Sequence, residues 1–209
     1  MKLALKSRKL SRLLKTISLL VIIGVVSLLT IAFLSKGSVV SQHHTQLDTM
    51  PMVDTALKTS FTKLSNAHTD VCRDIGDLPA IEKYMASLPS GSRLQGSCCS
   101  PMDIKHYVSQ INSLRAYANI PEIPTNPYDV SKASAEQMLG FYNNIQLTPA
   151  QQSIYDQAQK MTADHGWCCC KCWAWYTHAR LAKYLITQHD FTTQQIVAVT
   201  NLEDCCGGA

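Results

Sequence analysis

The stretch WCCCKCWAWYTHARLAKYLITQH, residues 167–189, attaches four cysteines to a run of residues that favours a helix. After the cysteines, apolar side chains recur at helical spacing, and neither glycine nor proline interrupts the run before His189. We therefore expect an amphipathic helix over about 170–189, with thiols gathered at its N-terminal end. The same segment predicts both a long helix and the densest group of thiols in the chain.

Helix start signals recur on both sides of this stretch. Thr148 and Gln151 match a capping box, as do Thr192 and Gln195. Ser100 precedes a proline and is expected to cap another helix. Runs that alternate apolar and polar residues are scarce, so the sequence predicts an all-α domain. The expected helices cover about 80–88, 104–117, 130–143, 149–165, 170–189 and 193–204.

The N-terminal region has the pattern of a membrane anchor. Residues 16–35 contain no charged residue, and twenty helical residues span roughly 30 Å, the thickness of a bilayer core. Residues 1–15 carry six Lys or Arg and no acidic residue, which predicts a cytoplasmic N-terminus. A cleaved signal peptide is the alternative, but the apolar run is longer than usual and no A-x-A pattern ends it.

These features divide the chain into four parts. A basic cytoplasmic tail covers 1–15, a transmembrane helix 16–35, a linker 36–53, and an exported cysteine-rich helical domain 54–209. The chain after residue 35 contains thirteen basic and fifteen acidic residues, a net charge of −2. The basic residues of the tail set the orientation, and no nucleic-acid partner is expected. We expect a single-pass protein whose domain lies in a periplasm or at the cell surface.

All nine cysteines belong to the exported part and form four groups. Most lie near expected helix ends, where the helix dipole and unpaired N–H groups would lower the pKa of a thiol. If 170–189 and 193–204 form a helical hairpin, the last cysteine pair returns to the first cluster. The groups are Cys72, then Cys98 and Cys99, then Cys168, Cys169, Cys170 and Cys172, then Cys205 and Cys206.

The first chemistry that suits this arrangement is a polythiolate site for a soft metal. The cluster contains Cys-x-Cys spacings, which let thiolates share Cu(I), and one C-x-x-C, which is half of a common zinc pattern. His165 lies just before the cluster and is a further candidate ligand. A metal-handling protein would be the natural partner of such a site. The candidate ligands are Cys168, Cys169, Cys170, Cys172, Cys205, Cys206, Cys98, Cys99 and His165, and the expected metal is copper or zinc.

Two other chemistries remain open. Exported cysteines are usually bridged, so the domain is alternatively a disulfide-stabilised scaffold or interaction domain. Against this, adjacent cysteines bridge each other only with strain, and nine is an odd number. The third alternative is a thiol–disulfide oxidoreductase at Cys169 and Cys172, although a βαβ pattern is missing. No G-x-S-x-G, H-E-x-x-H or glycine-rich phosphate loop occurs, so nothing points to another catalytic role.

The segment WCCCKC, residues 167–172, resembles the core of bacterial membrane-tethered proteins named for a PCYCGC motif. Cys168, Cys170 and Cys172 fall on the three cysteines of that motif. Trp167 and Lys171 stand where the motif has Pro and Gly, and the tether here is an apolar helix instead of a lipid. The resemblance covers about 45 residues, and it implies a metal-binding role in the cell envelope.

Overall fold

The computed structural model describes residues 54–67 and 76–207. The expected tail, transmembrane helix 16–35 and linker lie outside these ranges, as does Cys72. The described residues are mostly helical, with 59% in helices and 4% in strands, so the all-α prediction holds at this coarse level. Within the described ranges, every helix is too short or too polar to cross a membrane.

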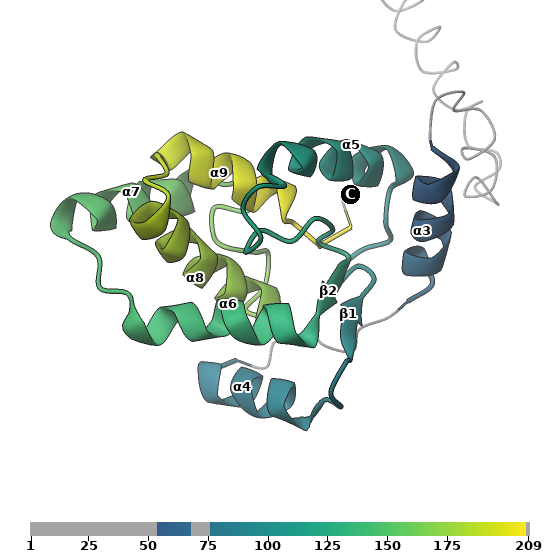
Figure 1. Ribbon diagram of the computed structural model, residues 1–209, viewed down its shortest axis with the longest axis horizontal. Helices are drawn as coiled ribbons and strands as arrows, with labels where there is room; N and C mark the ends of the chain where they lie inside the picture. Colours follow the sequence, from purple (N-terminus) through teal and green to yellow (C-terminus); the bar gives the residue numbers. More distant parts are fainter. Residues whose placement is uncertain (1–53, 68–75, 208–209) are drawn as a thin grey trace, which may run out of the picture. The chain divides into compact units, whose positions relative to one another are not determined.

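The described elements follow one another as short helices with a single strand pair (Figure 1). They are α3 (Thr55–Ser65), α4 (Leu78–Ser87), β1 (Arg93–Gln95), α5 (Ile104–Leu114), the 3-10 helix η2 (Arg115–Tyr117), β2 (Asp129–Ser131), α6 (Lys132–Asn144), α7 (Pro149–Met161), α8 (Trp173–Gln188) and α9 (Thr193–Leu202).

Most helix starts follow from local capping chemistry. Both predicted capping boxes form. In each, the hydroxyl of Thr148 or Thr192 accepts a hydrogen bond from the backbone N–H of the glutamine three residues later, and the side chain of that glutamine accepts one from the backbone N–H of the threonine. The expected cap at Ser100 is wrong. Asp103 caps α5 instead, and its carboxylate accepts from the backbone N–H of His106 at 2.8 Å.

The helix ends and the strands differ in detail from the sequence prediction. α8 begins at Trp173, so Cys168–Cys170 lie in the loop before the helix rather than in its first turn. α7 ends at Met161, four residues earlier than expected. β1 and β2 pair antiparallel, with Leu94 opposite Val130. A strand of three residues is too short to produce a recognisable alternating pattern, which is why the pair was not predicted.

The core of this unit forms around α8. It packs against α6, α7 and α9, and α9 in turn contacts α5 (Figure 1). A helix that is surrounded by others must be apolar or hydrogen-bonded on most faces. Accordingly Leu181, Leu185 and Ile186 are almost fully buried, and the buried Arg180 donates to the carbonyl of Leu139 in α6.

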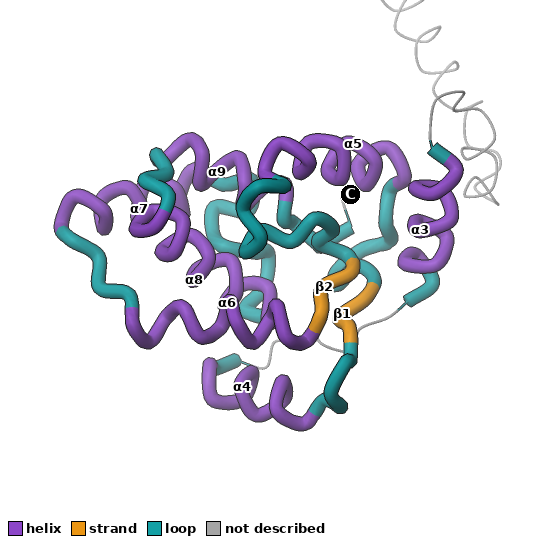
Figure 2. Tube along the Cα trace, viewed as in Figure 1, coloured by secondary structure: helices purple, strands orange, loops and turns teal. Residues whose placement is uncertain are grey.

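The hairpin of α8 and α9 places three loops side by side. α8 leads away from the first cysteine cluster and α9 returns the chain toward it, and the segments that carry cysteines are loops (Figure 2). Two backbone bonds of 3.0 Å fix the last segment against the earlier one, from Cys98 N to Cys205 O and from Ser100 N to Cys206 O. The fold thereby joins segments more than a hundred residues apart.

Candidate metal centre

Eight cysteines from these three loops form one connected group, which we call the thiol cluster. The structure shows no disulfide bond among these eight cysteines. Each sulfur atom lies within 4.0 Å of at least one other sulfur of the group. The members of the thiol cluster are Cys98, Cys99, Cys168, Cys169, Cys170, Cys172, Cys205 and Cys206.

Cys206 occupies the centre of the thiol cluster. Its sulfur lies 2.9 Å from that of Cys169, 3.4 Å from that of Cys168 and 3.9 Å from that of Cys98. These three partners come from two different loops, so Cys206 connects the segments that the hairpin brings together. The predicted approach of the last cysteine pair to the first cluster is confirmed.

Cys99 forms a second junction. Its sulfur is 3.1 Å from that of Cys169 and 3.8 Å from that of Cys170. The sulfur of the neighbouring Cys98 lies 3.8 Å from that of Cys99 and 3.7 Å from that of Cys205. The early pair therefore joins both later groups, a contact that the sequence suggested without determining it.

The cysteines of the thiol cluster differ in how deeply they are buried. The side chains of Cys172 and Cys205 are fully buried, and Cys168 is nearly so, with 7% exposed. Cys99 and Cys169 are exposed. The sulfurs of Cys168 and Cys172 lie 4.0 Å apart. The cluster thus has a dry inner side and an outer side open to solvent.

Five thiols of the cluster have a raised pKa, contrary to the expectation from helix ends: Cys168, Cys169, Cys170, Cys205 and Cys206. Burial, followed by the charge of Cys172, raises the pKa of Cys170 and of Cys205. Burial also raises the pKa of Cys169. The sequence prediction was wrong for these thiols because they are buried in the assembled cluster, and burial disfavours the charged thiolate.

Two carboxylates, the exposed Asp164 and the half-buried Asp204, also lie beside the thiol cluster, and they were not predicted from the sequence. Asp164 and Asp204 each bring an oxygen within 4.8 Å of the sulfurs of Cys168 and Cys206. Burial raises the pKa of Asp164, and the charge of Asp204 adds to the effect. The sequence did contain a signal, because Asp204 directly precedes Cys205 and Asp164 stands four residues before Cys168. These oxygens offer ligands for a harder ion than Cu(I).

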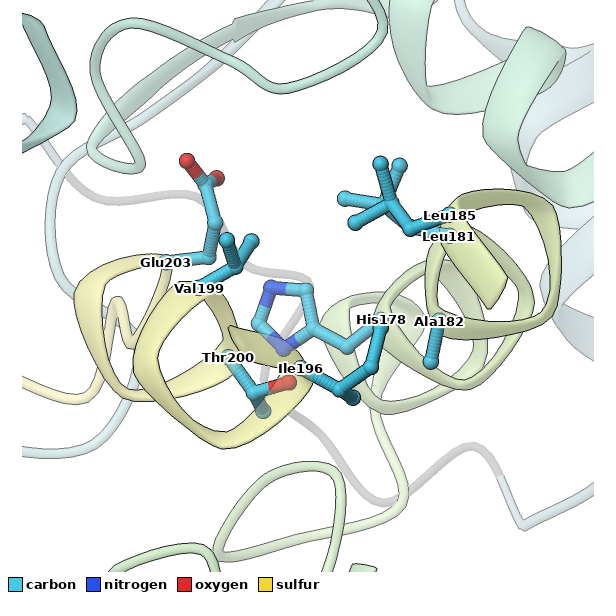
Figure 3. A pocket seen from close by; sticks show the side chains of 8 residues that line it. All are labelled: His178, Leu181, Ala182, Leu185, Ile196, Val199, Thr200 and Glu203. Atoms are coloured by element: carbon cyan, nitrogen blue, oxygen red, sulfur yellow. The ribbon is translucent and has the colours of Figure 1, made fainter. Parts of the chain in front are cut away.

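The two histidines near the cluster lie apart from it. His165 is exposed, and its Nδ1 is 3.1 Å from the carbonyl oxygen of Lys160. Among the described residues, the groups whose ligand atoms lie within 4.8 Å of one another do not include it. His178 is buried, and its Nδ1 lies 2.8 Å from the carbonyl oxygen of Trp167. Its ring points from α8 toward α9, beside Val199 and Glu203 (Figure 3).

The sulfur separations match metal coordination better than disulfide bonding. Four sulfur ligands about 2.3 Å from one ion are about 3.8 Å apart, and three ligands in a plane are about 4.0 Å apart. Most separations in the thiol cluster fall between 3.4 and 4.0 Å. A disulfide requires about 2.05 Å and gives each sulfur one partner. Cys206 has three.

The family models, the curated proteins and the solved structures searched contain no match to the chain.

Proposed function

We propose that this protein binds a soft metal ion, Cu(I) in preference to Zn(II), through the thiol cluster. The observation that carries the proposal is the position of Cys206, whose sulfur lies within 3.9 Å of three other sulfurs from two loops. Polythiolate surroundings select soft ions, because a polarisable sulfur binds Cu(I) or Zn(II) more strongly than a hard ion. The spacing shared with proteins of the PCYCGC motif supports the same proposal.

The raised thiol pKa values argue against an oxidoreductase. A thiol that attacks disulfides needs a lowered pKa, so that a thiolate is present near neutral pH. Burial raises the pKa of Cys169, the residue that such an enzyme would use with Cys172. A metal ion removes this obstacle, because it binds the thiolate and displaces the proton. Raised pKa values therefore suit a site that is charged only when metal is present.

The proposal includes a place in the cell. Residues 16–35 are proposed as a single transmembrane helix, with residues 1–15 in the cytoplasm and the cysteine domain outside it. A site with some exposed thiols, such as Cys99 and Cys169, suits the exchange of an ion with a metal-handling partner protein. Sequestration or delivery of metal at the membrane is the resulting role.

The test is a joint count of metal and thiols. The full chain is purified in detergent without oxygen, and its bound metal and its free thiols are measured together. We expect copper or zinc in stoichiometric amount, with cluster thiols that react only after a chelator removes the metal. The proposal fails if eight cysteines of the purified chain are in disulfides and the chain, once reduced and offered metal again, still binds none. That result would instead support a disulfide-stabilised scaffold.

Two serine variants serve as a matched pair. Cys206→Ser removes the sulfur with three partners and is expected to lower the affinity for Cu(I) at least tenfold. Cys72→Ser also removes one thiol, but from a position outside the proposed ligand set, and should leave the affinity unchanged. Equal loss in both variants would contradict a site centred on Cys206. Competition with a Cu(I) chelator of known affinity measures both.

A further inference from the structure

The thiols that lie close enough to share an ion form three overlapping groups. In each group the three sulfurs lie within 4.8 Å of one another. The groups overlap in a regular way, because any two of them have one cysteine in common. The three groups are Cys98, Cys168 and Cys206; Cys99, Cys169 and Cys206; and Cys168, Cys169 and Cys170.

This overlap defines two kinds of ligand. Cys168, Cys169 and Cys206 each belong to two groups, whereas the other three cysteines belong to one group each. A thiolate sulfur has enough lone pairs to bridge two metal ions. If each group holds one ion, the three shared sulfurs make two bonds each and the three others make one bond each. Every ion then has three sulfur ligands, and every sulfur is used.

We infer that the site holds three Cu(I) ions in a six-membered ring, in which the sulfurs of Cys168, Cys169 and Cys206 alternate with the metal. This inference rests on the proposed function and adds the number of ions and the role of each cysteine. Cys98, Cys99 and Cys170 complete the coordination from outside the ring. Each ion replaces thiol protons, which pass to the solvent, and no electron is transferred.

Three-coordinate sulfur surroundings distinguish copper from zinc. Cu(I) accepts three thiolates in a plane, whereas Zn(II) in structural sites takes four ligands. The same six sulfurs would leave each of three zinc ions one ligand short. Zinc would find its fourth ligand where Asp164 and Asp204 approach Cys168 and Cys206, a group of two oxygens and two sulfurs within 4.8 Å. The described residues thus offer an all-sulfur ring for copper and, for zinc, a mixed position that shares Cys168 and Cys206 with that ring.

The distances also indicate where the ring must adjust. An ion at Cys98, Cys168 and Cys206 finds separations of 3.9 and 3.4 Å, close to the ideal of about 4.0 Å. An ion at Cys99, Cys169 and Cys206 requires the sulfur of Cys169 to move about 1 Å away from those of Cys99 and Cys206, which now lie 3.1 and 2.9 Å from it. Cys99 and Cys169 are the exposed members, on loops, where such movement meets the least resistance.

The experiment titrates the reduced full chain in detergent with Cu(I) against a competing chelator, without oxygen. We expect saturation at three ions per chain, and an X-ray absorption spectrum with three sulfur neighbours and a copper–copper path. Saturation at one tightly bound copper without that path would overturn the ring while leaving the proposed function intact. Failure to bind copper or zinc at any level would remove both.

Two serine variants test which sulfurs bridge. Cys206→Ser takes a ligand from two ions and should reduce the capacity from three ions to one. Cys170→Ser, the matched control at another half-exposed position, takes a ligand from one ion and should retain at least two. Equal capacity in the two variants would overturn the assignment of Cys206 as a bridge. Circular dichroism of the reduced, metal-free variants confirms that each is folded.

The carboxylates provide the final distinction. Asp164→Asn with Asp204→Asn keeps the size of both side chains and an oxygen that can accept the 2.9 Å bond from Cys206 N. We expect this double variant to retain three Cu(I) ions and to lose at least tenfold in Zn(II) affinity. Loss of copper capacity in the double variant would overturn the all-sulfur ring.

Discussion

His178 is a buried histidine whose pKa the fold lowers. Burial is the main cause, although the Trp167 carbonyl and the charges of Asp204, Cys172 and Asp164 favour the protonated ring. The cavity beside it, about 10 Å³, is shared with Glu203, whose own pKa burial raises.

The lowered pKa of His178 predicts that its contribution to stability decreases in mild acid. The unfolded chain binds a proton at His178 below about pH 6.5, while the folded protein does so only at lower pH. The contribution of His178 to the free energy of unfolding should therefore fall below pH 6.5, by up to about 1.4 kcal/mol per pH unit, whereas the raised pKa of Glu203 acts in the opposite direction. Urea unfolding of the reduced, metal-free protein at pH 7.5 and 5.5 measures it. His178→Gln should show a smaller difference between the two pH values, and an unchanged difference would contradict the assignment.

At the scale of elements, features that depend on neighbouring residues could be predicted from the sequence, whereas contacts between distant segments could not. The capping boxes before α7 and α9 depend on residues three positions apart, so the sequence contains the whole signal. The pairing of β1 with β2 depends on residues 36 apart, including the ion pair of Arg93 and Asp129. The thiol pKa values depend on burial that only the assembled loops produce, and for that reason their direction was predicted wrongly.

The segment after α9 lies so close to the loop before α5 that only glycine fits at position 207. Gly207 has a φ of 103°, and a Cβ there would stand 2.3 Å from the carbonyl oxygen of Ser100. Its carbonyl accepts from the backbone N–H of Asp103 at 3.1 Å. The chain thus uses this glycine for close approach of two backbone segments.

Gly207→Ala should separate the two segments. We expect the free energy of unfolding to fall by about 1 kcal/mol or more, because the substitution is strained and breaks the bond to Asp103. Gly140→Ala, in α6, is the control: nothing lies within 4 Å of its added Cβ, and stability should rise by about 0.5–1 kcal/mol. Denaturant unfolding compares them. An equal gain in both variants would show that the approach of Ser100 does not constrain the tail.

Across the whole molecule, the thiol cluster and the helical core are distinct parts of one unit. The core around α8 consists mostly of buried apolar side chains such as Leu185 and Ile186, and we expect its stability not to depend on metal. Three backbone bonds join the loop before α5 to the segment after α9, from the N–H groups of Cys98, Ser100 and Asp103. The sequence predicted the core through helix periodicity and named all eight thiols, but the contacts among them depend on loop positions that no local signal encodes.

Metal removal should therefore loosen the loops and leave the core intact. A ligand that binds only the folded state stabilises it by mass action, and most strongly where its ligands are held. We expect faster amide hydrogen exchange at 98–103 and 205–207 after chelation, with little change in α6 and α8. Mass spectrometry of the loaded and chelated full chain measures both. Uniform protection changes in all of these segments would contradict this division.

The distance along the chain between Cys98 and Cys205, 107 residues, has a consequence for how the protein is made. At about 5–20 residues per second, the ribosome needs roughly 5–20 s to produce the second thiol after the first. During that interval Cys98 and Cys99 exist without Cys206, the sulfur at the centre. Biosynthesis thus imposes this waiting period on the first two thiols of the cluster, and a reducing escort during translation would keep them available for the last two.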